Sequence, residues 1–182
     1  MDGTLTVAMH DFDGLRARLG LPAGAPILET CETHPERSRL LAEVGLWEEE
    51  LAEVARASPD ALPLLEYLHG RATLGILTRN TRATAFRTLE VTGLSRFFPP
   101  EAVLGRDQAA AKPDPEGILW LLSHWQTTGG DAVMVGDYLF DLQAGRAAGT
   151  ATVWIDRVGG RDFHAHADRR VTELDQLVRR TN

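Results

Sequence analysis

The chain has 182 residues, the length of a single domain, and 43% of them are hydrophobic while 25% are charged. These proportions exclude a disordered or fibrous chain. The formal net charge of −7 argues against nucleic acid and against an anionic membrane surface as partners. The single cysteine cannot form an internal disulfide, and neither a signal-peptide pattern nor an apolar run of roughly 20 residues is present, so we expect a cytoplasmic protein.

The beginning of the chain shows helical patterns without a strand signal. Helices are expected in the segments Leu15–Leu19, Ala25–Thr30 and Pro35–Ala57. Within the last of these, the run Glu48-Glu49-Glu50 is interpreted as a solvated face. We predict that residues 12–57 form a small helical insert, which is carried by a larger domain made of residues 1–11 and 58–182.

From about Ser58 onward, short apolar runs alternate with amphipathic helical patterns. The expected strands are Thr73–Leu77, Ala132–Val135 and Thr150–Ile155. The expected helices are Leu62–His69, Arg82–Thr92, Gly117–Trp125, Leu139–Ala148 and a short terminal helix, Val171–Arg180. Short strands separated by helices are typical of a parallel sheet that is buried on both faces. The pattern therefore predicts a doubly wound α/β fold with its functional groups at the carboxyl ends of the strands.

Four short polar motifs fall at the expected strand ends. In chain order they are Asp2-Gly3-Thr4-Leu5-Thr6, Ile76-Leu77-Thr78-Arg79-Asn80, Ala111-Lys112-Pro113-Asp114-Pro115 and Val135-Gly136-Asp137-Tyr138-Leu139-Phe140-Asp141. Each motif alone has a structural explanation as a turn, a helix cap or a surface loop. Their order along the chain, together with their positions at strand ends, makes the combination informative.

In this order the motifs resemble those of the haloacid dehalogenase-like hydrolase superfamily, specifically the phosphoglycolate phosphatase-like proteins of subfamily I, which have a small helical cap. The resemblance covers nearly the whole chain. It implies an α/β fold with a three-layer Rossmann-like parallel-sheet core and a helical cap inserted after the first motif. It also implies Mg²⁺-dependent hydrolysis of a small phosphorylated metabolite through an aspartyl-phosphate intermediate.

The resemblance implies a role for one or more residues of each motif. Asp2 is implied to be the general acid and base, and Lys112 to offset negative charge in catalysis. The implied phosphate-binding residues are Thr78, Arg79, Asn80 and Lys112. The implied Mg²⁺ ligands are Asp2, through its backbone carbonyl, Asp137 and Asp141, the last by direct or indirect contact. Arg79 has an alternative interpretation as a surface charge beside a helix.

The family's first motif reads Asp-x-Asp-Gly-Thr, and Met1 aligns with the x. The nucleophilic Asp would therefore stand immediately before Met1, and we expect the 182-residue chain to lack appreciable phosphatase activity. A second Asp-x-Asp-Gly sequence begins at Asp11, but it lacks the following Thr and runs directly into an expected helix. Capping of that helix by Asp11 or Asp13 is the simpler interpretation.

Three other functions remain open. The first is a dehalogenase or phosphomutase of the same superfamily, and the second is a catalytically inactive binding protein with this fold. The third is a phosphoacceptor signalling domain, against which the order of the residues argues, because Asp137 and Asp141 follow Lys112. The sequence identifies neither the substrate nor the oligomeric state.

Several residues outside the motifs are expected to be structural. Cys31 has no activating pattern around it and is expected to be a buried apolar group. The pair His164 and His166 lacks the spacing and the carboxylate of a metal-ligand set. The four tryptophans, which are expected to pack in cores or between insert and core, are Trp47, Trp120, Trp125 and Trp154.

Overall fold

The structure is a computed structural model that describes residues 1–178. Its helices are α1 (Phe12–Leu19), α2 (Ile27–Thr33), α3 (Arg37–Glu53), α4 (Ala61–Leu68), α5 (Arg82–Val91), α6 (Glu116–His124) and α7 (Leu139–Ala147). Its strands are β1 (Ile76–Leu77), β2 (Val103–Leu104), β3 (Val133–Gly136), β4 (Ala151–Ile155) and β5 (Arg169–Val171). Short 3₁₀ helices are η1 (Ser95–Phe97), η2 (Pro100–Ala102), η3 (Gly129–Asp131), η4 (His164–His166) and η5 (Leu174–Leu177).

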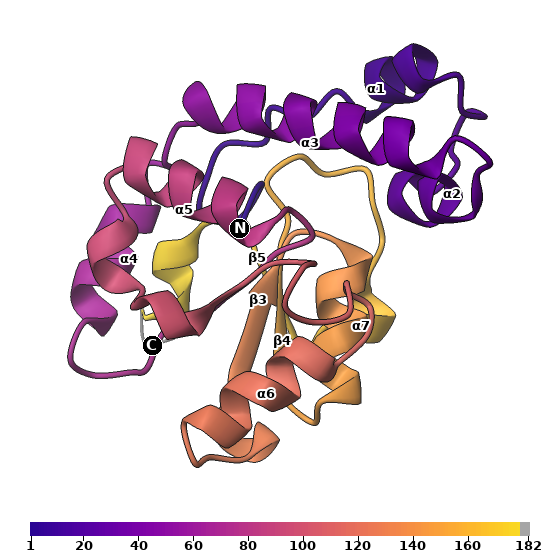
Figure 1. The fold of residues 1–182 in the computed structure, drawn as a ribbon. Helices are drawn as coiled ribbons and strands as arrows, with labels where there is room; N and C mark the ends of the chain where they lie inside the picture. Colours follow the sequence, from indigo (N-terminus) through magenta and orange to yellow (C-terminus); the bar gives the residue numbers. More distant parts are fainter. Residues whose placement is uncertain (179–182) are drawn as a thin grey trace.

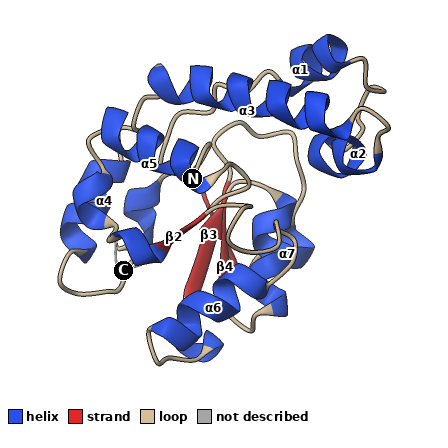
Figure 2. Cartoon of the chain, in the orientation of Figure 1, coloured by secondary structure: helices blue, strands red, loops and turns tan. Residues whose placement is uncertain are grey.

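Every strand pair in the described part of the chain is parallel. Strand β1 pairs with β2, with Ile76 opposite Val103, and β3, β4 and β5 form a second sheet in that order. The strands lie together in the middle of the molecule (Figure 2). The predicted α/β class with a parallel sheet is therefore confirmed.

Helices cover both faces of these strands. Successive side chains of a strand point to opposite faces, and the strand residues on both faces are apolar. Ile76 and Val103 pack in one apolar cluster with α4 and α5. Their neighbours Leu77 and Leu104 pack in a second cluster with α6 and α7. Helices α4 and α5 lie on one side of the strands and α6 and α7 on the other (Figure 1), which confirms the predicted three layers.

Helices α1, α2 and α3, here called the helical part, lie above the ends of the strands (Figure 1). They have a core of their own, made of Leu15, Leu19, Leu21, Cys31, Leu40 and Val44. Asp11 caps α1 by accepting a hydrogen bond from the Gly14 amide at 2.9 Å, as the capping interpretation predicted. The cysteine is fully buried, as expected.

The chain enters and leaves the helical part at one place. Val7 N–H donates to the Arg56 carbonyl at 2.9 Å, and Ser58 N–H donates to the Leu5 carbonyl at 2.8 Å. The remaining described residues, here called the α/β part, hold all five named strands. The boundaries predicted for an insert at residues 12–57 stay a prediction, although no named strand lies between Phe12 and Ala57.

Three expectations about local structure are wrong or incomplete. The terminal helix predicted at Val171–Arg180 is not formed in the described residues. Val171 ends β5, because it pairs with Ile155 of β4, and only the short η5 follows. Residues 179–180 lie outside the described part. Trp120 is 46% exposed rather than packed in a core. Strands β2 and β5 carry no clear sequence pattern, since each has only two or three residues.

No helix of the described chain is long and apolar enough to cross a membrane.

Candidate active site

The first motif forms a turn at the carboxyl ends of the strands. Its geometry depends on the Met1 carbonyl, which accepts hydrogen bonds from the amides of Thr4, Leu5 and Thr6 at 2.8–3.3 Å. Gly3 adopts a φ of +73°, and a Cβ atom there would lie 2.4 Å from Asp137 Oδ2. Only glycine therefore allows the turn to approach the fourth motif so closely.

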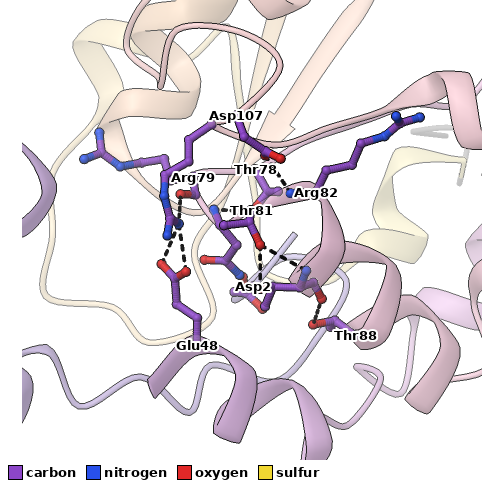
Figure 3. A network of polar contacts seen from close by, with 11 residues as sticks. Asp2, Glu48, Thr78, Arg79, Thr81, Arg82, Thr88 and Asp107 are labelled. Carbon is purple, nitrogen blue, oxygen red and sulfur yellow. Dashed lines mark hydrogen bonds and ion pairs between the residues drawn. The ribbon is translucent and has the colours of Figure 1, made fainter. Parts of the chain in front are cut away.

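Asp2 is held between its own turn and the second motif. Its Oδ1 accepts a hydrogen bond from the Thr6 hydroxyl at 3.3 Å, and its Oδ2 accepts one from the Asn80 side-chain amide at 3.0 Å. Asn80 N–H also donates to the Thr78 hydroxyl at 3.2 Å, directly after β1. Asp2 and Thr78 consequently belong to one polar network (Figure 3).

Lys112 and Asp141 form a buried ion pair. Lys112 Nζ lies 2.7 Å from Asp141 Oδ1 and donates to the Leu77 carbonyl at 2.5 Å. Tyr138 N–H donates to Asp141 Oδ2 at 3.0 Å, so both carboxylate oxygens have partners. Burial acts to raise the pKa of Asp141, but the charges of Lys112 and the N-terminus and the hydrogen bonds from Lys112 and Tyr138 together outweigh it, and the net pKa is lowered.

Asp137 has a different environment from Asp141. It is largely buried and accepts a hydrogen bond from the Thr4 hydroxyl at 3.1 Å. Burial and the neighbouring Asp141 raise its pKa, which means that its negative charge is poorly compensated by the described residues. A buried carboxylate in this state fits a bound cation.

Within the described part of the chain, the side chains around Asp137 form a partial donor set for Mg²⁺ and not a complete cage. No three Asp, Glu, His or Cys side chains in residues 1–178 converge into a complete cage. Mg²⁺ usually keeps several waters and is bound through one or two carboxylates together with a substrate phosphate. Asp137 beside the first-motif turn meets that smaller requirement, whereas Asp141 is already occupied by Lys112 and Tyr138.

Arg79 is fixed between the helical part and the third motif. Its Nη1 donates to the Lys112 carbonyl, and its Nη2 lies 2.8 Å from Glu29 Oε1 on α2. The guanidinium also lies 4.9 Å from the centre of the Phe140 ring. Arg79 thus borders the site through contacts that a bound anion would have to rearrange.

Glu48 and Arg106 are site neighbours that the motifs did not reveal. Arg106 Nη1 lies 2.8 and 2.7 Å from the two Glu48 oxygens and 2.7 Å from the Arg79 carbonyl (Figure 3). Glu48 is 5% exposed, and burial raises its pKa to about 7 against the opposing effect of Arg106. The interpretation of Glu48 as part of a solvated face is therefore wrong. Its spacing from Leu40 and Val44, which are eight and four residues earlier on the same buried stripe, is the signal that the sequence offers.

Asp60 supports the first-motif turn indirectly, through Arg157. Its carboxylate accepts hydrogen bonds from both terminal nitrogens of Arg157, at 2.8 and 3.0 Å, and from the Leu174 amide at 2.7 Å. Arg157 Nη2 also donates to the Thr4 carbonyl at 3.0 Å. The position of Thr4, and through it of Asp137, therefore depends on residues far away in the sequence.

A cavity of about 670 Å³ joins these groups between the helical part and the α/β part. All seven site residues implied by the resemblance line it: Asp2, Thr78, Arg79, Asn80, Lys112, Asp137 and Asp141. The helical part and the segment that leads into it contribute further lining residues, among them His10, Phe12, Trp47 and Glu48. The structure thus brings the four motifs together at one cavity, while the chemical role of each residue stays a prediction.

Comparison with known proteins adds independent findings. A family model described as haloacid dehalogenase-like hydrolase matches residues 13–155, which reach from α1 to β4. A haloacid dehalogenase-like hydrolase domain-containing protein of Arabidopsis thaliana is 30% identical, in an alignment that covers 100% of this chain and 80% of that protein. A solved structure of a HAD phosphatase from Thermococcus onnurineus matches with a TM-score of 0.71 and 26% identity, over 97% of this chain and 93% of that one.

Another relative has a higher sequence identity to this chain, but over a shorter alignment. The pyrophosphatase PpaX of Listeria welshimeri is 45% identical over 83 residues. The alignment covers 45% of this chain and 37% of PpaX, so the chain spans little more than a third of the length of this relative.

Proposed function

The chain belongs to the haloacid dehalogenase-like hydrolase family, and we propose that it is a Mg²⁺-dependent phosphatase acting on a small phosphorylated metabolite. The observation that supports this most is the meeting of four motifs at one cavity. Acidic groups, a buried lysine and hydroxyl and amide donors lie there together, which is the combination that phosphoryl transfer requires.

Asp2 is proposed to be the general acid and general base of the reaction. Hydrogen bonds from Thr6 and Asn80 fix its carboxylate, so that it can protonate the leaving oxygen of the ester and then accept a proton from the attacking water. In the family pattern the nucleophilic carboxylate directly precedes Met1, and we propose that the phosphoryl group is transferred to that position as an aspartyl-phosphate.

Thr78 and Asn80 are proposed to bind the phosphoryl oxygens, with Arg79 beside them. The Thr78 hydroxyl and the Asn80 amide belong to the network of Asp2, which supports this role because their donors lie beside the proposed general acid and base. Lys112 contributes positive charge from a fixed position, because the Leu77 carbonyl and Asp141 both hold its ammonium group. Asp141 acts in this scheme by positioning Lys112.

Mg²⁺ is proposed to be held by Asp137 and by the backbone carbonyl of Asp2. When bound, the ion supplies positive charge to the phosphoryl oxygens. The fit rests on the poorly compensated charge of Asp137 and on the close approach of the Gly3 turn.

Mg²⁺ binding provides a test that does not depend on turnover. Calorimetric titration of the chain with Mg²⁺ in the presence of orthophosphate is expected to give saturable binding, which Asp137→Asn weakens by at least about 100-fold, since a ligand is lost rather than an outer partner. The matched control is Asp131→Asn, which changes an exposed aspartate at the opposite end of β3. Equal binding by Asp137→Asn and the control would remove Asp137 from the site.

Turnover of a generic phosphate ester is measured on two forms. One is the 182-residue chain, and the other carries an added apolar strand that ends in Asp directly before Met1. We expect the second form alone to hydrolyse the ester with Mg²⁺. Equal turnover by both forms would overturn the alignment of the first motif and favour Asp11 or Asp13 as the nucleophile. Mg²⁺ and phosphate binding without turnover by either form would favour an inactive binding protein.

Hydrolysis of inorganic pyrophosphate is the second candidate. It is favoured by the 45% identity to PpaX, although that alignment covers 37% of PpaX. Pyrophosphate therefore belongs in the same assays as an alternative substrate.

A further inference from the structure

The cavity is far larger than a phosphoryl group requires. Its volume of about 670 Å³ lies within the range of about 300–1,000 Å³ that is typical of pockets for drug-sized ligands. The carboxylates, Lys112 and the hydroxyl and amide donors of the proposed phosphatase site form only part of its lining. The rest of the lining therefore indicates what is attached to the phosphate.

One group of rings comes from the helical part and from the segment that leads into it. His10 and Phe12 are stacked at 5.3 Å between ring centres, and Trp47 contacts them at 5.2 and 5.8 Å. His10 lines the cavity together with Asp2 and Asp137, so its ring lies beside the proposed phosphatase site. The two carboxylates act to raise the pKa of its imidazole. Burial nevertheless lowers that pKa, so the imidazole is favoured in its neutral form and packs as an aromatic ring.

A second group of rings follows β3. Tyr138 and Phe140 pack edge to face at 5.1 Å, and each carries a guanidinium group over its face. Arg79 lies 4.9 Å from the Phe140 ring and Arg161 lies 5.1 Å from the Tyr138 ring. All four side chains line the cavity.

Several apolar side chains of this lining are left in contact with water. Phe12 is 49% exposed, Tyr138 is 43% exposed and Val158, which also lines the cavity, is 83% exposed. Apolar surface gains free energy when water is removed from it, and exposed apolar residues gathered in one cavity indicate a ligand with a matching surface.

We propose that the cavity binds a phosphate monoester whose alcohol carries a planar aromatic ring, of the nucleoside 5′-monophosphate class. The proposal rests on the phosphatase function proposed above, with the phosphate at Thr78 and Lys112 and the ring against the aromatic side chains. Rings and guanidinium groups stack on a planar base and tolerate changes in its identity. Hydrolysis would add one water and release the nucleoside and orthophosphate.

Smaller substrates leave this lining unused. A two- or three-carbon phosphate ester or inorganic pyrophosphate has little or no apolar surface to set against Phe12 and Tyr138. The exposed rings would then remain in water in the complex, and they would add nothing to affinity. A ring-bearing alcohol is the occupant that removes both from water while its phosphate stays at the donors.

The test compares two nucleotides with ribose 5-phosphate, which lacks the base, and with pyrophosphate, which lacks both the sugar and the base. Calorimetric titration of the 182-residue chain with Mg²⁺ present uses adenosine 5′-monophosphate, uridine 5′-monophosphate, ribose 5-phosphate and pyrophosphate. Both nucleotides are expected to bind at least about tenfold more tightly than ribose 5-phosphate, which corresponds to about 1.4 kcal/mol. Equal binding of the nucleotides and ribose 5-phosphate, or tighter binding of pyrophosphate, overturns the ring site alone. Failure of all four ligands to bind overturns the phosphatase function and the ring site with it.

A matched pair of variants locates the effect. Phe12→Ala removes a 49% exposed ring of the cavity, and Trp120→Ala removes a 46% exposed ring on α6 that does not line it. The ratio of nucleotide affinity to ribose 5-phosphate affinity is expected to fall by at least about threefold in Phe12→Ala and to stay unchanged in Trp120→Ala. An unchanged ratio in both variants, or an equal fall in both, overturns the assignment.

Discussion

The α/β part and the helical part line the same cavity, and they differ in the polar groups that they contribute. The α/β part contributes carboxylates, a buried lysine and small hydroxyl and amide groups at strand ends, which hydrogen bonds and an ion pair hold in place, and it also contributes the rings of Tyr138 and Phe140. The helical part contributes rings and one buried glutamate, Glu48. The groups of the proposed reaction thus lie at the strand ends, whereas the apolar surface available to the rest of a ligand comes from both parts.

The two parts also differ in how their buried charges are satisfied. Lys112 and Asp141 lie entirely within the α/β part, where a backbone carbonyl and a backbone amide complete their hydrogen bonds. Glu48 pairs instead with Arg106 across the boundary between the parts. The first pair holds a site together, whereas the second joins two regions that meet at the cavity, and the following variants separate these roles.

The largest effect is expected for Lys112→Met. Lys112 is 4% exposed, and its removal leaves the buried Asp141 carboxylate without a counter-charge. We expect the free energy of unfolding, measured by urea denaturation, to fall by about 3–5 kcal/mol. The double variant Lys112→Met/Asp141→Asn is expected to recover part of this loss. A loss below about 1 kcal/mol would show that water reaches Asp141 and would contradict its burial.

A smaller, pH-dependent effect is expected for Glu48→Gln. The folded pKa of Glu48 is about 7 and lies above its unfolded value, so the folded state binds more protons between these pKa values. The free energy of unfolding of the unmodified chain is therefore expected to fall by about 3 kcal/mol relative to Glu48→Gln as the pH rises from 4 to 8. Arg106 opposes this rise in pKa, while Asp2 and Glu49 add to it. Parallel pH profiles of the two proteins would contradict the shift.

The smallest effect is expected for Glu29→Gln, which breaks the contact between α2 and Arg79. Both side chains are partly exposed, at 48% and 23%, so the stability change is expected to stay under about 1 kcal/mol. The freed Arg79 Nη2 is expected to raise orthophosphate affinity, by less than about tenfold, in calorimetric titrations. A fall in affinity would show that Glu29 positions Arg79 rather than competes for it.

The comparison of the two parts also explains what could be predicted from the sequence. Strand-end motifs predicted the residues at the inner end of the cavity, because parallel strands bring their carboxyl ends to one edge. The acidic run at Glu48 predicts a solvated face, whereas the helical spacing of Glu48 from Leu40 and Val44 predicts burial, and the structure follows the spacing. Its partner Arg106 follows a strand of two residues, which is too short to show a pattern.

Long-range contacts account for the rest. Val171 was expected in a helix, but its pairing with Ile155 depends on how the chain returns to the sheet and not on its neighbours in sequence. The bond between Asp60 and Arg157 joins residues 97 positions apart, and no local spacing signals it. The rings of the cavity were likewise scattered in the sequence, and only the fold gathers them.

Asp60 makes the beginning of the site sensitive to motion near the end of the described chain. One carboxylate holds both the Leu174 amide of η5 and the guanidinium of Arg157, which in turn holds the Thr4 carbonyl. If η5 frays, Asp60 loses the Leu174 amide as a hydrogen-bond donor and is less restrained where it holds Arg157. Since Thr4 contacts both Arg157 and Asp137, we expect a ligand at Asp137 to restrain this chain of contacts and to slow the exchange of the Leu174 amide hydrogen with solvent.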